Sequence, residues 1–458
     1  MLKYQIMKKI NIIIFYCCLI IAISGCKKFL DEKPDAKLNI PSTLADFQAL
    51  LDYYPVINNN GASSGEVSAD NYYLLDADFQ ALTQDYQKNL YTWQKDNLFA
   101  LINNDWFYAY RPVFTSNTIL EGLGKIAPTA VNGSEYNNVK GEALYIRGKA
   151  FLKAIGLWSA AYDKTNATAQ LGIPIRLSSD FNQATVRSTQ QESYDQIISD
   201  LTSAAALLPI TPLQVLRPSK PAAYALLARA YLYMGQYDKA GLYADSCLQL
   251  NHTLIDFNSL NTAAAYPFMK FNAEVINDGQ MTNLAPIQNT RARVDTLLYN
   301  SYDSNDLRKE LFFKISINGT HVFKGSYEGG SSPFDGVAID EVYLMRAECY
   351  ARLNRTNEAL RDLNTLLVTR FKKGFFSPFI ATSSDAALSI ILTERRKELL
   401  MRGLRWNDLK RLNQNGANIS LTRNVNGQAY ILKPNDLKYT LPIPDDIIQL
   451  TGMQQNPR

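Results

Sequence analysis

Apolar residues recur three and four positions apart along much of the chain, which is the period of an α-helix with one buried face. The clearest stretch runs over Asp105–Leu123, where large side chains keep this spacing throughout. The same pattern predicts helices over Thr43–Tyr54, Tyr136–Tyr162, Arg187–Leu208 and Asp385–Leu412. In the third of these, Thr189 and Glu192 form a capping-box pattern that marks the first helical turn. The pattern therefore predicts a mainly α-helical chain.

Two helical hairpins, Ala222–Leu250 and Asp340–Leu367, carry small and aromatic residues at matching spacings. The equivalent positions are Ala228, Tyr231, Ala240 and Cys247 in the first hairpin, and Ala347, Tyr350, Ala359 and Leu366 in the second. A small residue lets two helices approach closely and a tyrosine fills the space beside it, as tetratricopeptide (TPR) hairpins require. The match indicates a TPR-like scaffold and says almost nothing about function.

Two stretches, about 55–100 and 251–336, interrupt the helical pattern with scattered Asn, Gly, Pro and Thr. Extended elements are expected at Leu171–Ile175, His321–Lys324 and Leu441–Asp446. Insertions between repeats commonly carry the binding face of a solenoid. We therefore expect a mainly α fold in which TPR-like helices, about 136–250 and 337–412, support long irregular loop insertions.

The N-terminus has the three parts of an export signal. A basic region is followed by an apolar stretch, Ile10–Ile23, which is too short to span a bilayer as a helix. The stretch ends in Ile-Ser-Gly-Cys, which resembles a bacterial lipobox and implies cleavage before Cys26 and lipid attachment to its thiol. An ordinary signal peptide with a chance cysteine at the cut is the alternative. We expect residues 1–25 to be a lipoprotein signal peptide and 26–458 to form a single domain.

Removal of the leader lowers the formal net charge from +4 to +1, because three lysines leave with it and no acidic residue does. No basic stripe is evident on one face, so nucleic acid is not an expected partner. The charges of Glu394–Arg411 are mixed in sign and indicate a solvated face or ion pairs more than phosphate binding. Cys247 and Cys349 are expected to be separate buried thiols rather than a disulfide.

Two glycine-containing motifs are interpreted as loops. Gly61–Gly65 matches G-x-S-x-G, but asparagines precede it where a nucleophile elbow needs a buried strand, so a flexible loop is the better interpretation. Gly325–Ser332 is rich in Gly and Ser and lacks the lysine of a phosphate-binding loop. No metal-ligand cluster is visible and no cofactor is expected, although a structural Ca²⁺ bound by loop carboxylates stays open.

Aromatic rings beside amides and carboxylates in loop-like sequence form the candidate ligand site. Sugar rings stack their C–H faces on aromatic side chains, and their hydroxyls need Asp, Asn or Arg partners. The residues that combine these properties are Asp70, Asn71, Tyr72, Tyr91 and Trp93, with Tyr327 as a further candidate. The same aromatics could instead pin long loops to the helical body. Trp158 and Trp406 lie on apolar helix faces and are assigned to the core.

Segments spread over nearly the whole chain resemble the SusD/RagB family. They are the lipobox, Ser116–Leu120, Gly141–Ala150, Gly172–Pro174, Leu226–Leu232, Glu394–Arg411, Leu441–Pro444 and Gln455–Pro457. One departure is the lack of the Gly-Tyr that often follows Asn-Pro in the family. The resemblance implies a surface-exposed outer-membrane lipoprotein that captures glycan, or in some members peptide, for a SusC-like TonB-dependent transporter. It also implies a binding protein rather than an enzyme, with its TPR-like face against the transporter and a lid-like closure over ligand.

Three alternatives to glycan capture stay open at this point. Peptide capture is possible within the same family. A glycoside hydrolase would need two carboxylates facing one pocket, which sequence alone does not place. A TPR assembly lipoprotein without a small ligand is the third, and the long insertion and the aromatic loops argue against it.

Overall fold

The computed structural model describes residues 40–458 except 60, 317 and 326. The chain divides into a unit of residues 1–42 and a compact unit of residues 43–458, and every element named below belongs to the second unit. The predicted signal peptide and the predicted lipidation site, Cys26, lie outside the described residues.

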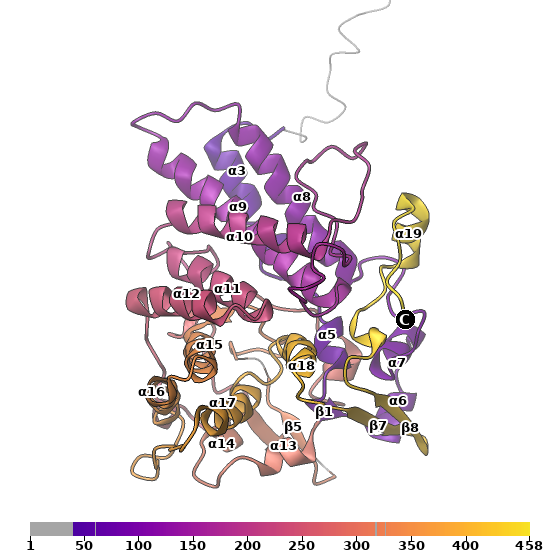
Figure 1. The fold of residues 1–458 in the computed structure, drawn as a ribbon, viewed down its shortest axis with the longest axis vertical. Coiled ribbons are helices and arrows are strands. Elements are labelled where there is room, and N and C mark those ends of the chain that lie inside the picture. The colour runs from indigo at the N-terminus through magenta and orange to yellow at the C-terminus, as the bar shows by residue number, and fades with distance from the viewer. Residues whose placement is uncertain (1–39, 60, 317, 326) are drawn as a thin grey trace, which may run out of the picture. The chain divides into compact units, whose positions relative to one another are not determined.

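Long helices pack one on the next and form the body of this unit (Figure 1). In chain order they are α8 (Asp105–Leu123), α9 (Gly133–Trp158), α10 (Gln190–Leu207), α11 (Lys220–Tyr233), α12 (Tyr237–Leu250), α15 (Ile339–Arg352), α16 (Thr356–Leu367) and α17 (Ser384–Glu398). Helix α8 begins and ends at the residues that its periodicity predicts. Thr189 caps α10 by the predicted reciprocal hydrogen bonds with Glu192. The mainly α fold is confirmed.

The two hairpins predicted from matched spacings have matching geometry. Ala228 and Ala347, which are equivalent, are both fully buried where the helices approach. The turns contain a residue with positive φ at the same place, Gly235 at 68° and Asn354 at 60°, and both of these residue types adopt that conformation readily. The backbone amide immediately before each second helix donates a hydrogen bond to the tyrosine carbonyl of the first, at 2.9 Å in α11–α12 and 2.8 Å in α15–α16. The TPR-like repeat is therefore present in the backbone as well as in the sequence.

Shorter elements occupy the insertions and the C-terminal region. The short helices are α3 (Leu44–Leu51), α4 (Tyr54–Ile57), α5 (Ser64–Ser68), α6 (Asp76–Gln80), α7 (Asp85–Tyr91), α13 (Thr296–Asn300), α14 (Arg308–Phe312), α18 (Arg405–Gln414) and α19 (Asp445–Thr451). The 3-10 turns are η1 (Phe257–Ser259), η2 (Ala285–Ile287) and η3 (Leu437–Tyr439). Thr43 caps α3 in a capping box with Asp46, and the helix predicted over 43–54 ends at Leu51 before the chain restarts as α4.

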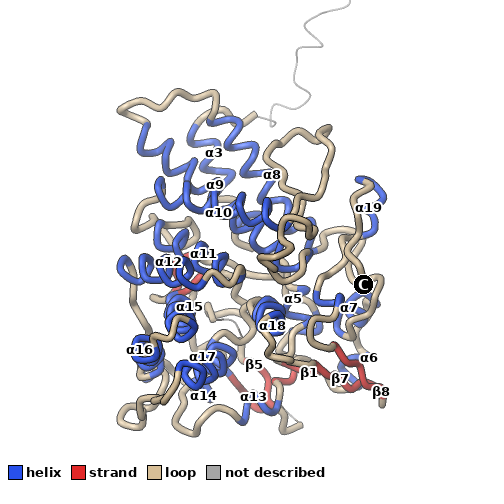
Figure 2. The backbone as a smooth tube through the Cα atoms, in the orientation of Figure 1, coloured by secondary structure: helices blue, strands red, loops and turns tan. Residues whose placement is uncertain are grey.

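Small antiparallel sheets tie distant segments together (Figure 2). One sheet has the strand order β1 (Tyr72–Tyr73), β3 (Arg293–Val294), β5 (His321–Phe323) and β4 (Phe313–Ile315), so it joins the first insertion to the second. The other pairs are β2 (Val275–Asn277) with β6 (Val337–Ala338), and β7 (Leu421–Val425) with β8 (Gln428–Leu432). The strand predicted near His321 is confirmed as β5.

Several local predictions need correction. The helix predicted over 385–412 is two helices, because Met401 and Gly403 have positive φ between α17 and α18. Leu171–Ile175 makes only an isolated bridge, between Leu171 and Thr189. The extended tail ends at Pro444, since α19 begins at the next residue.

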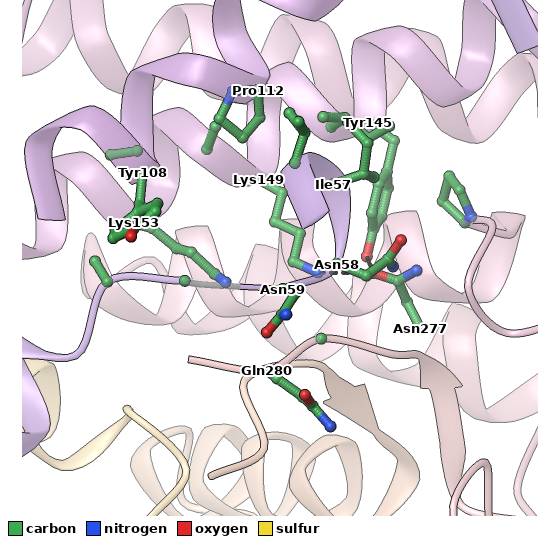
Figure 3. Close-up of a pocket in the computed structure, with 18 of the residues that line it drawn as sticks. Ile57, Asn58, Asn59, Tyr108, Pro112, Tyr145, Lys149, Lys153, Asn277 and Gln280 are labelled. Atoms are coloured by element: carbon green, nitrogen blue, oxygen red, sulfur yellow. Dashed lines mark hydrogen bonds between the residues drawn. The ribbon is translucent and has the colours of Figure 1, made fainter. Parts of the chain in front are cut away.

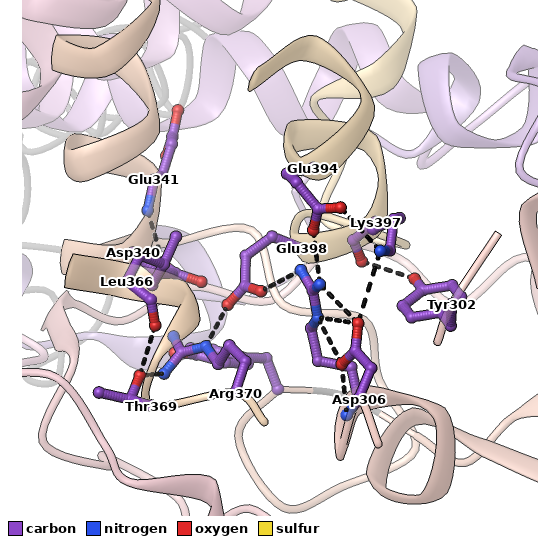
Figure 4. A network of polar contacts seen from close by, with 12 residues as sticks. Tyr302, Asp306, Asp340, Glu341, Leu366, Thr369, Arg370, Glu394, Lys397 and Glu398 are labelled. Atoms are coloured by element: carbon purple, nitrogen blue, oxygen red, sulfur yellow. Dashed lines mark hydrogen bonds and ion pairs between the residues drawn. The ribbon is translucent and has the colours of Figure 1, made fainter. Parts of the chain in front are cut away.

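A network of buried ion pairs fastens the second insertion to the helical body (Figure 4). Arg308, on α14, has no exposed side-chain surface and donates hydrogen bonds to three carboxylates, those of Asp306, Glu394 and Glu398. Arg370 follows α16 and joins Glu398 at 2.8 Å to Glu274 at 2.9 Å. The mixed charges at the end of α17 are therefore buried ion pairs and not a solvated face.

Candidate functional site

A pocket opens between α8 and α9 on one side and two irregular segments on the other (Figure 3). The first segment follows α4 and includes Asn58 and Asn59, and the second is the end of β2 with the turn to Gln280. The space free of protein atoms here is about 610 Å³, a figure that includes open solvent, and about 50 Å³ of it can hold the centre of a water molecule. Most of its wall is apolar, with a few polar side chains, which is the usual make-up of a small-molecule site.

Helix α9 supplies the polar side of the pocket. Tyr145, Lys149 and Lys153 are four residues apart, so all three project from one face of the helix toward the opposite segments (Figure 3). Tyr145 is fully buried, Lys149 is 8% exposed, and the Lys153 side chain is 25% exposed near the opening. The polar groups thus become more accessible from the floor of the pocket to its mouth.

Asparagines fix the floor. The Oδ1 atom of Asn277 accepts hydrogen bonds from the Tyr145 hydroxyl at 3.1 Å and from Lys149 Nζ at 2.8 Å. Its Nδ2 atom donates to the carbonyl of Val215 at 3.3 Å. Asn58 Nδ2 donates to the carbonyl of Asp278 at 3.0 Å. The insertion and the α10–α11 connection are therefore held in place around the two lysines.

The two lysines differ in their charge environment. Lys153 forms an ion pair with Asp335, which also lies against Gly61. Lys149 has no carboxylate within ion-pair distance among the described residues. Burial, followed by repulsion from Lys153, lowers the pKa of Lys149 to about 7, although the charge of Asp335 partly offsets this.

Lys270, in the second insertion, contacts two aromatic rings. The Lys270 ammonium sits 5.0 Å from the ring centre of Tyr54 and 4.9 Å from that of Phe271, which is 41% exposed. Gln280, which lines the pocket, donates a hydrogen bond to Glu328. Burial, then a hydrogen bond with Asp278 and repulsion from its charge, raises the pKa of Glu328 to about 8. Gln280 therefore connects the pocket to a carboxyl group with a raised pKa.

The aromatic residues selected from the sequence lie elsewhere, around Arg423 of β7. The Arg423 guanidinium is 3.8 Å from the ring centre of Tyr91, 4.6 Å from that of Trp93 and 5.4 Å from that of Tyr72. All three rings are at least 96% buried, and Trp93 also donates its indole N–H to the carbonyl of Ser68 at 3.0 Å. These rings surround an internal cation, which is the loop-pinning role that the sequence left open.

The other three selected residues are also committed to internal contacts. Asp70 pairs with Arg405 at 2.7 Å, and these contacts hold its pKa below the ordinary value despite burial. Asn71 donates to Glu66 at 3.0 Å, and Tyr327 donates its hydroxyl to Glu274. Direct ligand contact by the six selected residues stays a prediction, and their burial gives it no support.

The G-x-S-x-G segment is also not the flexible loop that the sequence predicts. Ser63 and Ser64 are 1% exposed, and their amides donate to one carboxylate oxygen of Asp105 at 3.0 and 2.7 Å. No strand leads into this turn within the described residues, as a nucleophile elbow would need. The segment is a buried turn that anchors α5 to the start of α8.

Other assignments to the interior are confirmed. Trp158 and Trp406 are 0% and 1% exposed, and Cys247 and Cys349 are free buried thiols.

In the described part of the chain, no helix has the length and hydropathy to cross a membrane. Over the same residues, no three His, Cys, Asp or Glu side chains gather as metal ligands would.

The pocket was missed because its residues come from five separate segments. One signal was available: Lys149 lies among mostly apolar residues in a buried part of α9, and Lys153 follows one turn later. A charged side chain on the buried face of a helix has a high desolvation cost and therefore marks a site worth testing.

Comparisons with known proteins agree with this architecture. A family described as "Starch-binding associating with outer membrane" matches residues 28–232, and one described as "SusD family" matches residues 339–458. The SusD-like protein P2 of Formosa agariphila is 22% identical, over 98% of this chain and 100% of that protein.

Solved structures show the same fold. A putative sugar binding protein from Bacteroides vulgatus superposes with a TM-score of 0.74 at 22% identity, over 92% of this chain and 99% of that one. A SusD superfamily protein from Bacteroides thetaiotaomicron gives 0.73 at 22% identity, over 91% and 100%. The two family matches take in well over half of the sequence and lie on both sides of the second insertion. The chain therefore belongs to the SusD/RagB family of outer-membrane-associated proteins.

Proposed function

We propose that this protein captures an oligosaccharide or polysaccharide outside the cell and delivers it to a SusC-like TonB-dependent transporter. The lipid on Cys26 would hold it at the outer membrane. The observation that carries the proposal is the family match over residues 28–232, whose description is starch binding at the outer membrane. That range includes α8 and α9, which form one wall of the pocket.

The chemistry of the pocket fits a sugar. Apolar walls suit the C–H faces of a pyranose ring, and the amides of Asn59 and Gln280 with the two lysines supply partners for hydroxyl groups. Binding at a site built from two insertions and the helical body would also favour whichever arrangement of these parts holds the ligand more tightly.

The pocket can be tested by filling it. Ala62 lines the pocket and is half-buried, so Ala62→Trp places a large ring in the cavity. We expect at least tenfold weaker binding to whichever glycan binds the unmodified protein, measured by calorimetry over a panel of oligosaccharides. Ala81→Trp is the matched control, because Ala81 is exposed at the end of α6, away from the pocket lining. Equal affinity in both variants would remove the pocket from the site.

The same experiments distinguish the alternative functions. Release of shorter sugars from the panel would indicate a hydrolase, and binding of peptides but no glycan would indicate peptide capture. Co-purification with a SusC-like transporter from the outer membrane is the expected result for the partner. Absence of that transporter from a mild-detergent preparation would contradict the delivery step.

A further inference from the structure

We propose that the ligand of this pocket carries an acidic group, a carboxylate or a sulfate, and that Lys149 binds it. The inference rests on the proposed function and adds the substrate class, which is a uronate-containing or sulfated oligosaccharide rather than a neutral one. Its basis is the arrangement of charges around α9.

Lys149 is a buried amine with incomplete hydrogen bonding, and an anion beside it would favour its ammonium form. An ammonium group has three N–H donors. The acceptor that Lys149 uses among the described residues is the neutral Oδ1 atom of Asn277, at 2.8 Å, and this atom also accepts from Tyr145. The side chain lines the pocket while only 8% of the residue is exposed. Free donors of a desolvated cation therefore face the space in which a ligand would lie.

The nearby acidic groups do not neutralise it. Asp335 is held by Lys153, and the contact is close enough for a direct ion pair. Asp278 is fully buried and raises the pKa of Glu328, and no ion pair joins it to Lys149 among the described residues. Both acids act on Lys149 only at longer range, where they partly offset its desolvation.

These contacts suit Lys149 to bind an anion more than a hydroxyl group. Burying a charge without a counter-charge is costly, and a fold that needed only a filled position there would be better served by an apolar side chain. A sugar hydroxyl would use one N–H and leave the charge uncompensated. A carboxylate or sulfate would use the remaining donors and supply the missing negative charge, with Lys153 one turn away as a second contact at the mouth.

Charge selectivity is the readout that tests this inference. The acidic probes are oligogalacturonate, oligoalginate, chondroitin sulfate and carrageenan fragments, and the neutral probes are cello-, malto-, xylo- and galacto-oligosaccharides. We expect acidic probes to bind at least tenfold more tightly, as a charge-assisted hydrogen bond predicts. Lys149→Met should abolish that preference. Lys140→Met, a half-buried lysine on the same helix that does not line the pocket, should leave it unchanged.

Folding is monitored separately, so that lost binding is not mistaken for lost structure. Lys149→Met removes a desolvated charge and keeps the length of the side chain, so the free variant should be at least as resistant to urea as the unmodified protein. Preservation of acidic-probe affinity in this variant would overturn the inference.

The outcomes distinguish failure of the acidic-ligand inference from failure of the proposed glycan capture. Tight binding confined to uronates or to sulfated fragments would identify which acid the pocket takes. Equal binding of neutral and acidic probes would overturn the acidic class and leave glycan capture in place. Binding of none of the probes would overturn both.

Discussion

Replacing Arg308 by methionine is expected to destabilise the protein by about 4 kcal/mol at pH 7. Its guanidinium is completely buried and contacts Asp306 at 2.6 Å, Glu394 at 2.5 Å and Glu398 at 2.9 Å. Methionine preserves most of the stem and removes the charge. Among the described residues, Lys397 then remains as the ion-pair partner of Glu394 and Asp306. Arg370 remains as the partner of Glu398, and it is shared with Glu274.

The magnitude follows from the least costly response of the folded variant. One buried carboxyl group takes up a proton, and moving a glutamate from its ordinary pKa of about 4.3 to above 7 costs about 1.36 kcal/mol for each pH unit, or about 4 kcal/mol. This agrees with the roughly 3–5 kcal/mol typical of a broken buried ion pair. At pH 5 the same step costs only about 1 kcal/mol. The difference in the free energy of unfolding between parent and variant should therefore shrink as the pH falls, because the folded variant binds one more proton than the folded parent.

Equilibrium urea unfolding at pH 7 and pH 5 measures this difference. Tryptophan fluorescence and far-UV circular dichroism should be followed together, since coincident transitions establish two-state behaviour. Arg355→Met is the matched control, because Arg355 pairs with Glu358 at 3.0 Å with half of its side chain exposed. The control should lose about 0.5 kcal/mol or less. A deficit below about 1 kcal/mol for Arg308→Met at pH 7, or one equally large at pH 5, would refute the reasoning.

Two further predictions concern the tether and a buried amine. Cys26→Ser should move the protein out of the detergent-phase membrane fraction and abolish labelling by radioactive palmitate; retention of the label would exclude this cysteine as the attachment site. Lys410 donates to the carbonyls of Gly156 and Ser159 at the end of α9, and burial lowers its pKa to about 7. The unfolded chain holds that proton up to about pH 10.5, so stability due to this lysine rises with pH, and between pH 7 and 10 the parent should gain about 3 kcal/mol over Lys410→Met in urea unfolding. A constant difference would show that the amine titrates normally.

Local signals predicted the helical body well. The capping box at Thr189 and the matched spacings around Tyr231 and Tyr350 involve residues within one turn or one hairpin, so the sequence contains both partners of each interaction. The same reasoning could have found the hairpin of β7 and β8, because Asn426-Gly427 is a strong signal for a two-residue turn and both residues have positive φ.

The candidate site depended on partners far apart in sequence. Tyr72, Tyr91 and Trp93 have the composition of a sugar platform, but Arg423, more than three hundred residues later, occupies the faces that a sugar would use. Composition alone does not distinguish a ring that stacks on a ligand from one that stacks on the protein's own guanidinium.

For the same reason, the sequence left the charged run at the end of α17 open between a solvated face and ion pairs, and the structure shows ion pairs. Glu394 and Glu398 have local cations that suit a solvated helix face, yet their strongest partner is Arg308, which comes from the second insertion. A charged helix face can be exposed to solvent or can pair with charges from a distant part of the chain, and only the tertiary structure distinguishes the two.

Helices α12 and α15 pack directly on each other although nearly ninety residues separate them in the chain. The intervening excursion therefore starts and finishes at neighbouring points, and the stack would close in the same way around a longer or shorter one, since loop length has little effect on closure entropy. Cargo preference could diversify by exchanging this excursion as a cassette. The exchange has one condition: a new cassette must supply a cation in place of Arg308 for Glu394 and Glu398, and a carboxylate in place of Glu274 for Arg370, or these buried groups of the stack would each lose a partner.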